Sequence, residues 1–217
     1  MPRSLCCLLM IGFTLRAFAA PEEPARAEQL RPGPLRVVIE QLYGHPVIPY
    51  DGQCREQIEA AAREAFSLIN RHGLSARRVN EIGNAVEPLV IAALQAQGFS
   101  ADIPTTASGR RQSSGYPDIE ARFQDRLFYF EIKTYNPANE DTTQRSFYLS
   151  PSADPKVTAP ACHLLIAFGM EQEADGFYRA RTVRVLDIAE LSLDLKLEFN
   201  ASNRDLYAPE HELFHAP

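Results

Sequence analysis

One stretch, GYPDIEARFQDRLFYFEIKTYN at residues 115–136, constrains the fold more than any other part of the chain. Polar and apolar side chains alternate over most of residues 118–123 and again over 127–135, which is typical of β-strands. Gln124 and Asp125 stand between the runs, so a loop of two or four residues makes an antiparallel hairpin. Both loop lengths give one register, in which Asp118 lies opposite Glu131.

This register predicts a charged face. Side chains repeat every two residues along a strand, so Lys133 falls on the same face as Asp118 and Glu131. Two opposed acids repel unless a cation lies between them, and carboxylate oxygens are preferred ligands of Mg²⁺. The alternative is a solvated surface on which Lys133 neutralises Glu131. The opposite face collects Ile119, Ala121, Phe128, Phe130 and Ile132.

The remaining pattern predicts an α/β fold. Residues 55–72 carry an apolar stripe with helical spacing before Gly73, and a second helix ends at Gly98. That helix begins near Asn84 or kinks there, because Pro88 disrupts a helix interior. A helix is also expected near Ile188. Further strands are expected at residues 98–104, 163–170 and 176–185, in addition to the hairpin strands at 116–123 and 127–135. This order indicates a central mixed β-sheet flanked by helices in one domain at 35–217, with its core at about 84–187.

The first 34 residues are expected to lie outside that domain. A basic start, an apolar run at residues 5–15 and Ala17-Phe18-Ala19 predict a signal peptide at 1–19, followed by a Pro-rich linker at 20–34. The apolar run is too short to span a bilayer, so we expect a periplasmic or secreted protein without a membrane anchor. If translation instead begins at a later codon, the apolar run is not part of the protein and the protein is cytoplasmic. In the mature chain, Cys54 and Cys162 either pair as a disulfide or remain two buried free thiols.

The charge balance argues against broad affinity for nucleic acid. Removal of residues 1–19 leaves 20 basic and 28 acidic residues, so contacts with phosphate must be local. The loops at 105–115 and 136–161 supply four candidate contacts, for which solvated loop charges are the alternative. These candidates are Arg110, Arg111, Arg145 and Lys156.

Pro117-Asp118 followed by Glu131-Ile132-Lys133 resembles the signature of the PD-(D/E)xK nuclease superfamily, the restriction-endonuclease-like fold. The likeness extends over about residues 84–170, and GNAVEPLVIAALQAQGF is similar to the family's first core helix, whose glutamate would be Glu87. It implies an order of helix, three strands, linking segment and strand. The family usually has a helix in the linking segment, where SPSADPKVTAPAC instead indicates a loop.

The resemblance implies a metal-dependent nuclease with DNA as the favoured substrate. Asp118, Glu131, Glu87 and the Ile132 carbonyl would bind Mg²⁺ or Mn²⁺, and Lys133 would serve the attacking water. Glu87 is alternatively an ordinary exposed helical residue. The partner would be nucleic acid, and a homodimer is left open.

Two other functions remain as alternatives. The fold could bind DNA or a protein partner without catalysis, although all three motif charges are present. The C-terminal HELFH, His211 to His215, matches the H-E-x-x-H pattern of zinc peptidases, with Glu212 as the base. An ordinary frayed C-terminal helix is the simpler interpretation, because only two residues follow.

Overall fold

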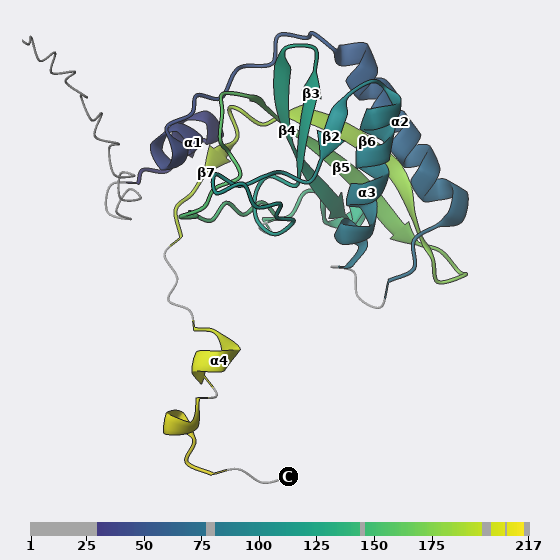
Figure 1. The fold of residues 1–217 in the computed structure, drawn as a ribbon. Coiled ribbons are helices and arrows are strands. Elements are labelled where there is room, and N and C mark those ends of the chain that lie inside the picture. Colours follow the sequence, from purple (N-terminus) through teal and green to yellow (C-terminus); the bar gives the residue numbers. More distant parts are fainter. Residues whose placement is uncertain (1–29, 77–80, 144–145, 197–200, 207, 215–217) are drawn as a thin grey trace, which may run out of the picture.

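The computed structural model describes residues 30–76, 81–143, 146–196, 201–206 and 208–214. A five-stranded sheet forms its centre, and two long helices, α2 (Arg55–His72) and α3 (Glu81–Ala96), cover one face of that sheet (Figure 1). The expected α/β class, with a mixed sheet flanked by helices, is confirmed. The predicted signal peptide and residues 20–29 of the predicted linker lie outside the described residues.

The two long helices form where apolar residues recur at helical spacing. In α2, Ile58, Ala61, Ala65 and Ile69 are buried, and Gly73 ends the helix as predicted. In α3 the buried stripe is Ile82, Val86, Val90, Ala93 and Leu94. Of the two alternatives for α3, a start near Asn84 is wrong, because the helix begins at Glu81 and continues through Pro88. Pro88 lacks the N–H that would bond one turn back, but burial of the stripe offsets this loss.

The sheet order is β2-β3-β4-β5-β6, with bounds Ser100–Asp102, Ile119–Phe123, Arg126–Tyr135, Cys162–Gln172 and Tyr178–Asp187. Strands β4 and β5 run parallel, and the other neighbours are antiparallel. The hairpin register is confirmed: Ile119 pairs with Phe130 and Phe123 with Arg126 across a two-residue turn. Gln124 takes a positive φ of 55°, as such turns require.

Both faces of the hairpin are buried over much of its length. The predicted apolar face packs against α2 and α3, where Ile119, Phe128 and Phe130 belong to the larger core cluster. The other face carries Leu127 and Tyr129 into a second cluster with the N-terminal helix. Every residue from 127 to 132 is buried, which argues against the alternative of a solvated face over this part of the hairpin.

The second cluster is built by a helix that the sequence pattern did not identify. Helix α1 (Leu35–Tyr43) buries Leu35 and Ile39, and it follows strand β1 (Gly33–Pro34), which pairs with β7 (Ser192–Leu193). The helix expected near Ile188 is absent from the described residues. Instead, the carbonyls of residues 189 and 191 accept bonds from the first N–H groups of α1, at 3.0 and 2.8 Å. Residues 30–34 are consequently part of the domain rather than linker.

Three other segments complete the described chain. Apart from 144–145, the connection at 136–161 contains only the 3-10 helix η2 (Pro137–Asn139), in agreement with the expected loop. At the C-terminus, α4 (Asn203–Leu206) and η3 (Pro209–His211) extend away from the sheet in Figure 1. Glu212 has extended backbone, so the described part of HELFH is not the α-helix that a two-histidine zinc site needs, and His215 lies outside the described residues.

The cysteines are not bonded to each other. Cys162 begins β5 and is buried, while Cys54 precedes α2, and both are free thiols. The disulfide is therefore not formed, and the alternative of two buried free thiols holds for Cys162 but not for the half-buried Cys54. No helix among the described residues combines the length and the apolar character needed to cross a bilayer.

Candidate active site

The candidate site lies on β4, where the covered part of one sheet face gives way to solvent. Alternate residues of β4 share this face, and their exposure increases along the strand. Tyr129 is fully buried, Glu131 is 4% exposed, and the side chain of Lys133 is 29% exposed. A carboxylate is thus placed at the boundary of the core with a lysine on its open side.

Asp118 is held at the end of the hairpin by main-chain bonds. It lies directly before β3, and its own N–H donates to the Phe130 carbonyl at 3.0 Å. Its side-chain Oδ2 accepts a 2.7 Å bond from the N–H of Ile132. The carboxylate therefore caps the ladder between β3 and β4, and this fixes one oxygen beside Glu131. Burial raises the pKa of Asp118, while the Ile132 bond and Lys133 oppose that rise.

Glu131 has one satisfied and one unsatisfied oxygen. Its Oε1 accepts a 2.5 Å bond from Lys133 Nζ, whereas Oε2 is buried without a hydrogen-bond partner. Burial, together with the negative charge of Asp118, raises the pKa of Glu131 to about 7. A buried carboxylate oxygen without a partner in the protein is costly, and a bound cation would offset that cost.

Glu87 projects into the same electrostatic environment from α3. It is half-buried, and burial followed by the charge of Asp118 raises its pKa to about 7. Lys156 and Lys133 act in the opposite direction. Glu87 is therefore not an exposed residue on the far side of its helix, although no hydrogen bond joins it to Asp118 or Glu131 among the described contacts.

The four predicted nucleic-acid contacts have different environments. Arg110 and Arg111 are exposed, but each pairs with an acid: Arg110 with Asp154 at 3.4 Å and Arg111 with Asp102. Arg145 lies outside the described residues. Lys156 is only 3% exposed, so its prediction as a surface contact for phosphate was wrong. The segment at 151–161 folds inward, and Lys156 lies near the carboxylates of the site.

A buried pair of residues behind Asp118 was missed by the sequence analysis. The Tyr116 hydroxyl and His163 Nδ1 are 2.5 Å apart, and the two rings are stacked. Burial lowers the pKa of His163 to about 3 and raises that of Tyr116 well above its usual value. The phenol and the imidazole are therefore both neutral, and they share one hydrogen bond whose direction depends on the tautomer of His163. Tyr116 adjoins Pro117-Asp118, but nothing in the local pattern indicates its partner on β5.

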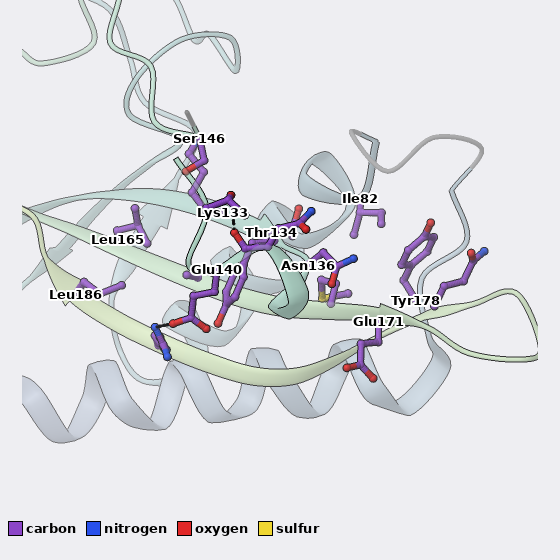
Figure 2. A pocket seen from close by; sticks show the side chains of 17 residues that line it. Ile82, Lys133, Thr134, Asn136, Glu140, Ser146, Leu165, Glu171, Tyr178 and Leu186 are labelled. Atoms are coloured by element: carbon purple, nitrogen blue, oxygen red, sulfur yellow. Dashed lines mark hydrogen bonds and ion pairs between the residues drawn. The ribbon is translucent and has the colours of Figure 1, made fainter. Parts of the chain in front are cut away.

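A cavity of about 710 Å³ opens beside Lys133. Figure 2 shows Lys133 and Ser146 at one end, Glu171 and Tyr178 at the other, and Leu165 and Leu186 on the strands. Its wall includes the connection after β4, with Asn136, Asn139 and Glu140, the last paired with Arg184. The sheet face is therefore open next to Glu131 and Lys133.

The carboxylates of the site suit a hard cation whose coordination shell is completed by other ligands. Among the described residues, no three His, Cys, Asp or Glu side chains gather closely enough to hold a metal by themselves. Asp118 and Glu131 nevertheless supply two carboxylates, and one of them carries an unpartnered oxygen. Mg²⁺ typically binds one or two carboxylates and keeps waters or substrate phosphates as its other ligands. The residues therefore fit such an ion, with Glu87 and the Ile132 carbonyl as further candidate donors.

Comparison with known proteins places the chain in a family. The model of the type II restriction enzyme MjaV family matches residues 30–210, and the type II restriction enzyme MjaV of Methanocaldococcus jannaschii is 37% identical over 163 residues. That alignment covers 71% of this chain and 70% of the relative. The chain belongs to the type II restriction enzyme MjaV family. The expected relationship to restriction-endonuclease-like nucleases is thereby confirmed.

A solved structure also resembles this MjaV family member. It is the crystal structure of the tetrameric restriction endonuclease SfiI bound to cognate DNA, with 13% identity and a TM-score of 0.40. The match covers 64% of this chain and 63% of the SfiI chain. The MjaV family model spans the candidate site together with α1 and the C-terminal segment up to residue 210.

Proposed function

We propose that this MjaV family member is a PD-(D/E)xK endonuclease that cleaves DNA with Mg²⁺ or Mn²⁺. The observation that supports this most strongly is the unpartnered Glu131 Oε2, buried beside Asp118. An isolated buried carboxylate oxygen is destabilising unless a ligand completes it. A divalent cation would complete it and would also reduce the repulsion between the two acids.

Phosphodiester hydrolysis requires an activated water and neutralisation of charge at the leaving oxygen. When bound, the divalent ion supplies positive charge for both needs. Asp118 and Glu131 would hold it, and the Ile132 N–H keeps the Asp118 carboxylate in place. Glu87 is assigned as a further donor to the ion, because it is half-buried and feels the charge of Asp118.

Lys133 is assigned to the attacking water. It is the exposed member of the charged row on β4, and it borders the cavity that substrate can enter. Its bond to Glu131 fixes the ammonium at that border. From there it orients the water and stabilises the negative charge that develops on the phosphoryl oxygens.

DNA is proposed as the substrate because the 37% identical relative is a type II restriction enzyme. One copy of the chain carries one candidate site, so cleavage of both strands is most simply achieved by a homodimer on a two-fold symmetric sequence. The expected result on supercoiled plasmid is direct linearisation. If nicked circles accumulate and light scattering shows that the protein is a monomer on DNA, the homodimer is refuted. The proposed nuclease activity is not affected by that outcome.

The central test is cleavage by the purified protein of plasmid, single-stranded DNA and RNA, each with Mg²⁺, Mn²⁺, Ca²⁺ or chelator. Cleavage of duplex DNA is expected with Mg²⁺ or Mn²⁺. Little is expected with Ca²⁺, because its looser coordination positions water poorly. DNA binding without cleavage under every metal condition would instead support the inactive binding module, and cleavage in the presence of chelator would refute metal dependence.

Three variants connect that activity to the site. Lys133→Ala should lower the cleavage rate by about a hundredfold to ten-thousandfold and leave metal binding largely intact. Asp118→Asn should weaken metal binding as well as cleavage, because it replaces a charged ligand. The matched control is Glu120→Gln: Glu120 lies on β3, two residues after Asp118, but pairs with Arg122 at 3.3 Å, so activity should persist. Activity of Lys133→Ala equal to that of the parent would exclude this site.

A further inference from the structure

Lys156 is an unusual residue for a loop. It comes from the proline-rich segment between η2 and β5, yet its side chain is 3% exposed. Among the described residues, the buried polar or charged side chains are Thr106, Glu131, Lys156 and His163. Two of these four are the glutamate of the motif and the lysine near it. Burial of an ammonium is expensive, so a specific role is expected.

The direct partners of Lys156 are main-chain carbonyls. Its Nζ donates to the carbonyl of Ser113 at 3.3 Å and to that of Gly115. No carboxylate lies within ion-pair distance of Lys156 in the described contacts. Gly115 is followed by Tyr116, Pro117 and Asp118, so the lysine binds the backbone just ahead of the proposed metal ligand.

The same segment binds the earlier part of the 105–115 loop through Asp154. Its two carboxylate oxygens accept from the Ser108 N–H at 2.8 Å and from the Ser108 hydroxyl at 2.7 Å. The Pro155 carbonyl accepts from the Ala107 N–H at 2.9 Å. Residues 154–156 thus make two separate attachments to one loop, and only the attachment through Lys156 is next to Asp118.

We propose that Lys156 is a positioning residue that holds residues 113–115 and thereby sets the Asp118 carboxylate for metal binding. This inference rests on the proposed function only in one respect, which is that Asp118 binds a divalent metal ion. The acids explain how the ammonium stays buried: the charges of Asp118, Glu131 and Glu87 favour its protonated form against the effect of burial. The acidic cluster stabilises the lysine that orders the segment before Asp118.

The test compares Lys156→Met with the parent and with Asp154→Ala in the full chain. Methionine resembles the unbranched, apolar stem of lysine but lacks the ammonium and its hydrogen-bond donors. Asp154→Ala removes the side-chain bonds of the other attachment and is the matched control. Circular dichroism and thermal melting show whether each variant is folded before other measurements are interpreted.

The first measurement needs neither metal nor activity. The Ile132 N–H donates to Asp118 Oδ2, so its hydrogen exchange reports whether the carboxylate is in place. We expect Lys156→Met to lower protection of this amide by about tenfold or more relative to core amides of β5. Asp154→Ala should leave it unchanged. Protection equal to the parent's in Lys156→Met would overturn the proposal even if the protein proves not to be a nuclease.

The second measurement is binding of Mg²⁺ and Ca²⁺ by calorimetry. Loss of a residue that orients a metal ligand typically weakens affinity by about 10- to 100-fold, which is the decrease expected for Lys156→Met. DNA affinity in Ca²⁺ should change by less than about threefold, since Lys156 is buried. Tighter metal binding would show that Lys156 acts only as a repelling charge, and a selective loss of DNA affinity would show a phosphate contact. Either result refutes the proposal.

A charge-preserving variant covers the case in which Lys156→Met does not fold. Lys156→Arg keeps the positive charge and the donors but cannot reproduce the position of an ammonium between two carbonyls. A folded Lys156→Arg protein should show intermediate Ile132 protection and intermediate metal affinity. If it matches the parent in both, exact placement of the lysine has no role and the proposal fails.

Discussion

Glu131 combines burial, one bonded oxygen and one unsatisfied oxygen, so its ionisation has consequences for the stability of the whole domain. In the folded protein it holds its proton up to about pH 7, whereas the ordinary pKa is 4.5. The folded state therefore binds this proton more tightly than the unfolded state between those two values. Its contribution to stability is present at low pH and is lost as the pH rises through the folded pKa.

We predict that the free energy of unfolding of the metal-free protein falls between about pH 4.5 and 7, by up to about 3 kcal/mol from Glu131. Asp118 shifts in the same direction, while Lys133 and Lys156 oppose the effect. Urea unfolding at several pH values measures the slope. Glu131→Gln should flatten it and raise stability at pH 8. Equal slopes for the variant and the parent would contradict the assigned pKa shift.

The buried Tyr116–His163 pair gives a second prediction. Tyr116→Phe leaves the buried His163 Nδ1 without its hydrogen-bond partner, which should cost about 1–3 kcal/mol of stability. The matched control is Tyr135→Phe, because the Tyr135 hydroxyl bonds Thr182 at 3.1 Å on the exposed part of the sheet. That change should cost at most about 1 kcal/mol. If both variants lose the same free energy of unfolding in urea, the buried bond contributes no more to stability than the exposed one.

The packing of strand β5 requires a glycine at position 169, where η2 lies against the strand. A Cβ on Gly169 would lie 2.5 Å from Thr182 Oγ1 and 3.1 Å from Pro137 Cγ, so η2 and β6 both approach this position too closely for a side chain. Because η2 adjoins the wall of the cavity beside Lys133, displacement here also affects the approach to the site.

We predict that Gly169→Ala destabilises the protein by about 1–3 kcal/mol, as overpacking in a core typically does. Gly83→Ala is the control, because a Cβ there meets nothing within 4 Å and Gly83 lies in α3. Alanine is favoured over glycine in helices, so that variant should be neutral or more stable by up to about 1 kcal/mol. Thermal melting of both variants tests the contrast, and no destabilisation of Gly169→Ala would show that η2 can move away.

For the whole molecule, export stays a prediction, since residues 1–19 lie outside the described residues. We expect the chain expressed with its own N-terminus in a bacterial host to begin at Ala20 and to enter the periplasmic fraction. Intact mass and cell fractionation measure both properties. A cytoplasmic protein that retains Arg3 and Arg16 would show that the apolar start is not a signal.

Much of the fold and of the motif could be predicted because the relevant signals are local. Alternation on either side of Gln124 and Asp125 specifies the hairpin register, since a shift by one residue would move Phe128 and Phe130 from the larger core cluster to the face that carries Glu131. The same alternation places Glu131 and Lys133 on one face. The apolar spacing of residues 55–72 likewise predicts α2 with its observed bounds.

The environment of those residues depends on chain segments that meet only in the folded protein. Lys156 bonds a carbonyl 41 residues away, and Tyr116 bonds a histidine 47 residues away. Neither contact has a periodic signal, because each comes from a loop whose path is set by packing against the second core cluster. The pattern of the hairpin therefore determines which charges share a face. The folded loops determine that Glu131 is buried and that a second lysine lies behind it, because desolvation depends on everything that packs around a residue.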